Sequence, residues 1–510
     1  MQANPDTTTK QIAADLGDDM DEHKMPVGYS PRLYNEDLAP VPEEKRTWKT
    51  YNLFALWMTD VHNVGTYVFA AALFATGLTG WRVFLGMLVG IMLVYFFINL
   101  VGKPSQRLGI PFPVAVRMSF GVFGANLPAL IRATIAIVWY GVQTYLASVS
   151  LQIVLLRFFP GLQPYATKLH SFVGLTALGW GCYLVMWALQ MTLFYKGMET
   201  VRRFIDWAGP AVYLVMFVLA VWIISKAGVG NIGISLTKKT LTTSQTINEM
   251  VKVAALIVSY FSTLLLNFGD FTRYTPSVKD MKRGNLLGLP VNWMLFSIVT
   301  VIVTSGTTSV FGQAIMDPIE VVGRIDNATA IALGSMTFIV AAIGVNIVAN
   351  FVSAAFDLAN ASPSRITFRT GGLIAGVIVL FTVPWHFYGS PEAINFFVGT
   401  IGGVLGPLYG IMVADYYLVK RQSVDRDHLY SDAVHGKYYY TRGWNMTAVY
   451  SLIPSAILSM ILSLVPIFDF IGPFNWFISA AVGATLYAIF SLRTQVSSTT
   501  SHQPISQVSD

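Results

Sequence analysis

Apolar runs of about 20 residues recur along almost the whole chain, and they limit its possible folds more than any other feature. A helix of that length spans the roughly 30 Å hydrocarbon core of a bilayer. Such runs lie near residues 52–76, 81–101, 124–157, 171–195, 204–226, 251–271, 285–312, 327–358, 371–388, 391–419, 443–467 and 471–492. The sequence therefore predicts an all-α polytopic membrane protein with about 12 transmembrane helices.

The composition supports this class. Only 12% of the 510 residues are charged, whereas soluble domains carry about 25%, so a soluble fold could not cover its surface with polar groups. The single cysteine, Cys182, excludes an intrachain disulfide framework and a cysteine-based metal site. We expect no metal and no cofactor.

Polar segments flank the apolar region. Residues 1–45 are acidic and contain several prolines, and no short apolar stretch with a cleavage site begins the chain. We therefore expect a disordered cytoplasmic tail there rather than a signal peptide. Residues 493–510 are rich in Ser, Thr and Gln and predict a second disordered cytoplasmic tail. The predicted membrane domain occupies residues 46–492.

Lys and Arg concentrate in alternate loops, after the second, fourth, sixth, eighth and tenth predicted spans. Cytoplasmic loops carry an excess of these residues, so the N-terminus is predicted to face the cytoplasm. With an even number of spans the C-terminus faces it too, in a multi-pass protein of the cell (plasma or inner) membrane. The net charge of +6 is therefore interpreted as a topology signal, and we expect no nucleic acid as partner.

Two predicted spans are poor continuous helices. The first contains WMTDVHNVGTY at residues 57–67, and the sixth contains SYFSTLLLNFGDF at residues 259–271. They lie five spans apart, as a five-plus-five inverted repeat with discontinuous helices requires. The alternative is two polar-lined helices that pack against their neighbours.

The third span places Trp139 and Gln143 four residues apart in IAIVWYGVQTYLAS, so they share one helix face. An indole offers a flat apolar surface, and a carboxamide offers one acceptor and two donors. Together they suit a planar, uncharged ring that carries amide groups. The alternative is a lipid-facing Trp and a Gln that bonds a neighbouring helix.

Further polar and aromatic residues lie in the eighth and sixth spans. Asn346 and Asn350 can pair with another edge of the same ring, although Asn also joins helices. Tyr260 and Phe261 lie close to the predicted break, where an aromatic ring can cover the second face of the ligand; the alternative is ordinary packing.

The first span adds an amide, Asn63, and two titratable groups, Asp60 and His62. Asp60 is the most costly of these residues to place in hydrocarbon, so it is a candidate carrier of a proton or cation. It can also pair with His62 or lie in a water-filled vestibule. Arg132 is a candidate counter-ion for Asp60.

Enzyme motifs are missing from the sequence. It contains no Gly-rich phosphate loop after a strand and no His-Glu-x-x-His. The run GGVLGPLYG at residues 402–410 suits close helix approach rather than nucleotide binding. We therefore expect that the protein is not an enzyme.

Five stretches in order carry a family resemblance: NEDLAPVPEEKRTWKTYNLFALWM, GIPFPVAVRMSFGVFGANLPALIRA, WYGVQTY, DFTRY and GPLYGIMVADYYLVKR. Over about residues 30–490 the chain resembles the first nucleobase:cation symporter family, which carries hydantoins, allantoin, uracil and cytosine. The resemblance implies two inverted five-helix repeats plus two extra C-terminal helices, with spans 1 and 6 broken.

The resemblance also implies a substrate site. The family's stacking Trp and hydrogen-bonding Gln match Trp139 and Gln143, and its second aromatic matches Phe261. Its span 8 amide matches Asn350, and its span 1 amide matches Asn63.

The family's cation site matches less well. Backbone positions match Thr59, His62 and Ala341, but the two hydroxyl positions of the sodium-coupled relatives match Gly344 and Val345, which have no oxygen in their side chains. This implies a co-transported proton rather than sodium, with Asp60 and His62 as candidate carriers.

We therefore predict a secondary active importer that works by alternating access, as a monomer in the lipid bilayer. The predicted substrate is uracil or a related pyrimidine nucleobase, and allantoin or a hydantoin is the alternative. Two other classes are a membrane-embedded enzyme and a transport-like sensor that binds the ligand without net flux.

Overall fold

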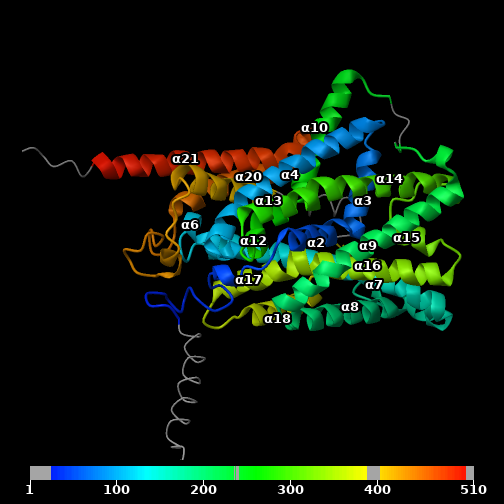
Figure 1. The fold of residues 1–510 in the computed structure, drawn as a ribbon, viewed down its shortest axis with the longest axis horizontal. Coiled ribbons are helices and arrows are strands. Elements are labelled where there is room, and N and C mark those ends of the chain that lie inside the picture. Colours follow the sequence, from blue (N-terminus) through cyan, green and yellow to red (C-terminus); the bar gives the residue numbers. More distant parts are fainter. Residues whose placement is uncertain (1–24, 235, 237–239, 387–402, 501–510) are drawn as a thin grey trace, which may run out of the picture.

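The computed structural model describes residues 25–234, 236, 240–386 and 403–500. Its long helices run along one common direction, which is horizontal in Figure 1. We call the end that carries residues 25–49 and 420–445 the terminal end, and the end that carries α15 (Pro318–Gly323) the distal end. In the described ranges the only strands are β1 (Ser171–Phe172) and β2 (Leu175–Thr176), a short antiparallel pair.

Eight described helical segments are long and apolar enough to cross a membrane. They are Trp81–Leu108 (α4), Asn126–Phe158 (α7), Ala177–Tyr195 (α8), Met198–Ala227 (α9), Val278–Phe311, Ala328–Ala361, Met446–Leu464 (α20) and Gly472–Arg493. Shorter apolar helices are Val64–Phe74 (α3), Phe368–Phe381 and Gly403–Val419. These segments fit the predicted all-α class, and the predicted boundary between the ninth and tenth spans lies outside the described residues.

The composite and remaining elements follow in chain order. They are η2 (Glu43–Lys45), α2 (Thr50–Val61), α5 (Phe112–Ala115), α6 (Arg117–Phe120), η3 (Pro160–Ala166), η4 (Lys168–His170), η5 (Val229–Asn231), α10 (Thr243–Tyr260), α11 (Ser262–Asn267), α12 (Gly269–Thr272), α13 (Val278–Leu286), η6 (Leu287–Val291), α14 (Asn292–Phe311), α16 (Ala328–Val345), η7 (Asn346–Phe351), α17 (Val352–Ala361), α18 (Phe368–Ile378), η8 (Val379–Phe381), η9 (Pro384–His386), η10 (Ala414–Val419), η11 (Asp427–Tyr430), η12 (Pro466–Phe468), η13 (Gly472–Phe474) and α21 (Asn475–Thr500).

The first span is interrupted where the sequence places its polar cluster. α2 ends at Val61, and α3 begins at Val64. Asn63 lies between them in an extended conformation and caps α3, because its Oδ1 accepts from the Thr66 backbone N–H at 3.1 Å. Asn63 Nδ2 donates to Thr66 Oγ1 at 2.8 Å. The polar residues therefore stabilise two half-helices whose ends meet inside the bundle.

The sixth span is interrupted less strongly. Phe261 separates α10 from α11, with φ −83° and ψ 2°. Its N–H still donates to Ile257 at 3.2 Å, and its carbonyl accepts from Leu265 at 2.9 Å. Three further irregular segments, η6, η7 and η10, are π-helical, and η7 carries Asn346 and Asn350. Such turns are frequent at functional sites.

Residues 25–45 differ from the predicted disordered tail. Leu33 and Leu38 are buried in the core, and the Tyr430 hydroxyl donates to the Leu38 carbonyl at 2.7 Å. Asp37 Oδ2 accepts from the Phe368 N–H at 2.7 Å, at the start of α18. Asp37 also bonds the chain just after α12, because Arg273 Nη1 donates to its carbonyl at 2.9 Å. This part of the N-terminal segment is packed against the terminal end, and the burial of two leucines provides the reason.

At the other end of the chain, α21 continues through Thr500, beyond the predicted boundary at residue 492. Residues 1–24 and 501–510 lie outside the described ranges.

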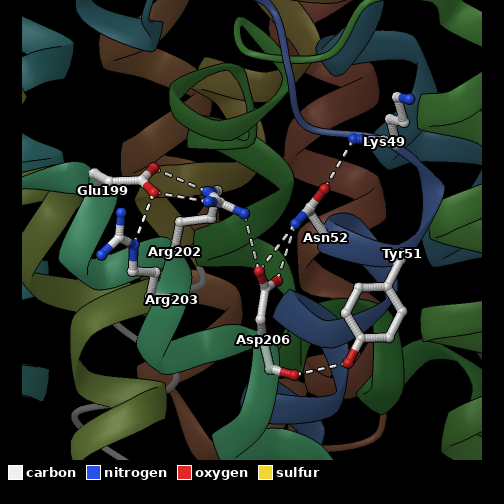
Figure 2. A network of polar contacts seen from close by, with 7 residues as sticks. All are labelled: Lys49, Tyr51, Asn52, Glu199, Arg202, Arg203 and Asp206. Atoms are coloured by element: carbon white, nitrogen blue, oxygen red, sulfur yellow. Dashed lines mark hydrogen bonds and ion pairs between the residues drawn. The ribbon is translucent and has the colours of Figure 1, made fainter.

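Asp206 of α9 is the centre of a polar cluster that joins α2 to α9 (Figure 2). Its carboxylate accepts from Asn52 Nδ2 at 3.0 and 3.1 Å and from Arg202 Nη1 at 3.1 Å. Its backbone carbonyl accepts from the Tyr51 hydroxyl at 2.7 Å. Glu199 accepts only from Arg202 and Arg203, which are on its own helix (Figure 2).

Candidate functional site

Three predicted site residues converge around Gly65, in the first turn of α3. A Cβ placed on Gly65 would lie 3.2 Å from Asn63 Oδ1, 3.6 Å from Gln143 Nε2 and 3.7 Å from the Tyr260 hydroxyl. These groups come from α7, α10 and the break before α3. Because Gly65 has no side chain, polar groups from three spans can approach its Cα closely.

Gln143 has the most informative side chain of this group. It is 6% exposed, and its Oε1 is buried without a hydrogen-bond partner among the described residues. An unpaired buried carbonyl costs about 1–3 kcal/mol. Trp139, partly buried, lies one turn away on the same helix. A ring N–H bound at this atom would remove the cost that Gln143 carries.

Asn63 and Tyr260 are both tied to the break in the first span. The amide of Asn63 is engaged in capping α3, as described above. The Tyr260 hydroxyl lies 2.9 Å from Thr66 Oγ1, and its ring stacks on Phe69 with centroids 4.4 Å apart. They lie at the predicted place, and their contacts brace the two half-helices.

Phe261 is 2% exposed and packs into an aromatic cluster. Its ring meets Trp293 edge-on at 5.5 Å, Tyr260 at 5.5 Å and Trp57 at 6.2 Å between centroids. These contacts place Phe261 against the first and seventh spans.

Asn350 lies on η7 and is part of a chain of amides that the sequence analysis did not assemble. Its Nδ2 donates to Asn346 Oδ1 at 2.9 Å, and Asn346 Nδ2 donates to Gln190 Oε1 at 2.7 Å. Gln190, on α8, was not predicted as a site residue. The signal was present, because a Gln in an apolar span is the same feature that singled out Gln143.

Asp60 and His62 are buried but not paired with each other. The His62 ring stacks on Tyr213 at 4.7 Å and meets Phe296 at 4.9 Å between centroids, and neither ring nitrogen has a hydrogen-bond partner in the ranges that the structure describes. The suggested pairing of Asp60 with His62 is therefore wrong in this structure.

Arg132 is not the counter-ion of Asp60 either. Its guanidinium donates to Asn267 Oδ1 at 3.2 and 3.3 Å and to the Ala349 carbonyl at 2.6 Å, while its Nη1 has no partner. Asn267 in turn donates to Asp270 at 3.2 Å. Arg132 therefore joins the third, sixth and eighth spans.

Thr59 lies at a close approach of the first, fifth and eighth spans, beside Gly209 and Gly344. Its hydroxyl donates to the Ala55 carbonyl at 2.9 Å and lies 3.4 Å from the Ile205 carbonyl. A Cβ placed on Gly344 would overlap Thr59 Cγ2, so this position needs glycine. Ala341 is buried one turn away on α16. The methyl group of Thr59 thus fills the space beside Gly344.

A helical bundle with two interrupted spans, and with amides converging at their breaks, has the architecture of a secondary transporter. Residues 40–482 match the family described as permeases for cytosine/purines, uracil, thiamine and allantoin, and the chain belongs to that family. It is a multi-pass membrane transporter for a nucleobase-like small molecule, not an enzyme.

Characterised relatives span most of the chain. An allantoin permease of Bacillus subtilis (strain 168) is 37% identical over 460 residues, which cover 90% of this chain and 93% of the relative. A purine-uracil permease of Arabidopsis thaliana is 31% identical over 452 residues, 88% of this chain and 74% of the relative.

Solved structures share the fold. A nucleobase-cation-symport-1 family transporter, closed with bromovinylhydantoin bound, has a TM-score of 0.72 at 22% identity, and the match covers 91% of this chain and 96% of that one. A sodium-coupled sialic acid symporter has a TM-score of 0.60 at 14% identity, with 91% and 92% covered. This likeness confirms the predicted fold class.

Proposed function

We propose that the protein imports a neutral cyclic amide across the cell membrane, with allantoin as the first candidate. The observation that carries this proposal is the buried Gln143 Oε1, which has no partner in the described part of the chain and lies one turn from Trp139. The ring stacks on Trp139, and its amide edge bonds Gln143. Asn350 bonds a second edge, while Asn63 and Tyr260 hold the break beside Gly65.

The relatives support an order for the two candidate substrates. The 37% identity with an allantoin permease over nine-tenths of the chain favours allantoin over uracil, which the sequence alone placed first. Uracil is the second candidate because a purine-uracil permease is 31% identical. Both compounds are planar or near-planar cyclic amides, so the same carboxamides can bind either.

The co-transported ion in this proposal is a proton. Gly344 and Val345 provide no hydroxyl, and the Thr59 methyl fills the space next to Gly344, so a sodium ion would lack oxygen ligands there. The backbone carbonyls at Thr59, His62 and Ala341 alone make an incomplete shell. Asp60 and His62, both buried in the first span, are the candidate proton carriers.

Transport follows the alternating-access scheme. The ion must bind preferentially to the outward-facing state, because a ligand drives a conformational change only by its difference in affinity for the two states. The repeat that carries the site then rocks against the other. We place both termini in the cytoplasm, following the Lys and Arg bias, and expect a monomer to be sufficient.

The test is uptake of radiolabelled allantoin by the purified protein in proteoliposomes, competed by uracil, hydantoin, cytosine and thymine. We expect an imposed proton gradient to drive accumulation and a protonophore to abolish it, while replacement of sodium by choline changes little. A steep dependence of uptake on sodium concentration would contradict the proposed proton coupling. Binding without counterflow would identify a sensor, and chemical conversion of the substrate would identify an enzyme.

A further inference from the structure

Gln190, Asn346 and Asn350 form a directed chain of hydrogen bonds from α8 to η7. Asn346 Nδ2 donates to Gln190 Oε1 at 2.7 Å, and Asn350 Nδ2 donates to Asn346 Oδ1 at 2.9 Å. The three residues are 1%, 0% and 4% exposed. Because no water competes for these bonds, the orientation of each amide is set by its neighbours.

The direction of the chain is anchored by backbone carbonyls, which can only accept. Gln190 Nε2 donates to the Met186 carbonyl at 3.2 Å, so its Oε1 must point to Asn346. Asn346 Nδ2 lies 3.0 Å from the Tyr140 carbonyl, so its Oδ1 must point to Asn350. The Thr144 hydroxyl donates to the same carbonyl at 2.7 Å and therefore accepts from Asn346 at 3.1 Å.

This chain sets the orientation of the Asn350 amide. One of the two N–H groups of its Nδ2 is committed to Asn346, so Asn350 can offer a ligand its second N–H and its only acceptor, Oδ1. Asn350 also lies beside the site, because Asn346 bonds Tyr140 and the Ala349 carbonyl bonds Arg132. Asn350 is thus held next to the stretch of α7 that carries Trp139.

We propose that Asn346 and Gln190 are positioning residues that fix Asn350 as a hydrogen-bond acceptor, and so select substrates with a ring N–H at that edge. This inference rests on the proposed function. Gln143 Oε1, which has no hydrogen-bond partner among the described residues, is a second acceptor of the site beside Asn350 Oδ1. A substrate with N–H groups on two edges therefore fits, and one methylated at the Asn350 edge does not.

The test compares hydantoin with 1-methylhydantoin and 3-methylhydantoin as competitors of radiolabelled allantoin uptake in proteoliposomes. In the wild type, one methyl isomer should compete at least about tenfold worse than hydantoin, the factor expected for a lost hydrogen bond plus a clash. In Asn346→Leu the Asn350 amide is free to turn. Hydantoin should then bind about five- to tenfold more weakly, while the affinity of the methyl isomer is unchanged. The ratio of the two affinities, hydantoin to methyl isomer, therefore falls towards one.

A second pair of variants tests the hydrogen bond between Gln190 and Asn346. Gln190→Met removes the acceptor while keeping the length of the side chain, and should lower the ratio about two- to threefold, because Tyr140 and Thr144 still hold Asn346. Gln190→Glu, as a neutral acid, can accept from Asn346 and donate to Met186, and should restore the ratio. Trp187→Phe is the matched control: it removes another α8 interhelical bond, to Gly376 at 2.7 Å, and should leave the ratio unchanged.

Two results would overturn the inference. The first is that the wild type does not discriminate between hydantoin and either methyl isomer. The second is that Asn350→Ala abolishes the discrimination, while the variants of Asn346 and Gln190 keep the wild-type affinity ratio. If Asn346→Leu is not recovered in the membrane, the Gln190 pair decides alone. Failure of the proposed function looks different, because Gln143→Ala and Asn350→Ala would then both leave allantoin uptake at the wild-type rate.

Discussion

At the scale of single residues, the main feature of the site is a hydrogen-bonding atom left without a partner. Most buried polar groups in the described part of the chain are paired, but Gln143 Oε1, like the His62 ring nitrogens and Arg132 Nη1, is not. In a bilayer such a group persists where a ligand or packing compensates its cost.

We expect Gln143→Ala to lower uptake of allantoin at sub-saturating concentration by about tenfold or more, since it removes both the acceptor and the donor of the amide. Trp139→Ala should have a similar effect through loss of the stacking face. Initial rates in proteoliposomes, normalised to the amount of folded protein, provide the measurement. Thr134→Val, an exposed position on the same helix, is the control. Wild-type rates in both site variants would refute the assignment.

Asp60→Asn tests the proton carrier. The neutral amide cannot exchange a proton, so accumulation driven by a proton gradient should be lost while allantoin–allantoin exchange continues. Uptake by the wild type should rise as the external pH falls, and the variant should lose this dependence. Retained accumulation in Asp60→Asn would transfer the role to His62, where His62→Gln is the corresponding variant.

At the scale of helices, the first and fifth spans are joined near the terminal end by Asp206 (Figure 2). The cluster bonds residues of α2 directly, through Asn52 and Tyr51. Glu199 provides a matched comparison, because its partners Arg202 and Arg203 lie on α9 alone.

Asp206→Ala should therefore loosen α2, whereas Glu199→Gln should not. We expect faster hydrogen exchange across residues 50–61 in Asp206→Ala, together with a shift toward the state that is open at the terminal end. Mass spectrometry of the two variants in nanodiscs measures the difference. Equal exchange in both would show that apolar packing alone holds α2 against α9.

At the scale of the whole molecule, the apolar runs and the polar break in the first span could be read from the sequence, because both depend on local composition. The packing of residues 25–45 could not be predicted, since its buried apolar residues Leu33, Leu38 and Val41 are scattered in the segment without helical or strand periodicity. The orientation of the Asn350 amide could not be predicted from the sequence either. It depends on Gln190, about 160 residues away in the chain, and on two backbone carbonyls.

The packed N-terminal segment should contribute to stability. Leu38→Ala removes a fully buried side chain and should lower the free energy of unfolding by about 2 kcal/mol or more. The midpoint of thermal unfolding in detergent should be lower for Leu38→Ala than for the wild type. Leu169→Ala, which changes an exposed leucine, should leave the midpoint unchanged. An unchanged midpoint for Leu38→Ala would mean that the segment detaches before the bundle melts.

Asp37 holds two parts of the transporter at once: its side chain bonds the first N–H of α18, and its carbonyl bonds Arg273, just after α12. The connection between those two helix ends runs through Asp37 and the side chain of Arg273, so it spans only a limited separation. A step of the cycle that parts the ends beyond the reach of the Arg273 side chain must first break one of the two bonds. The length of that arginine side chain thereby sets a threshold for an opening motion at this end.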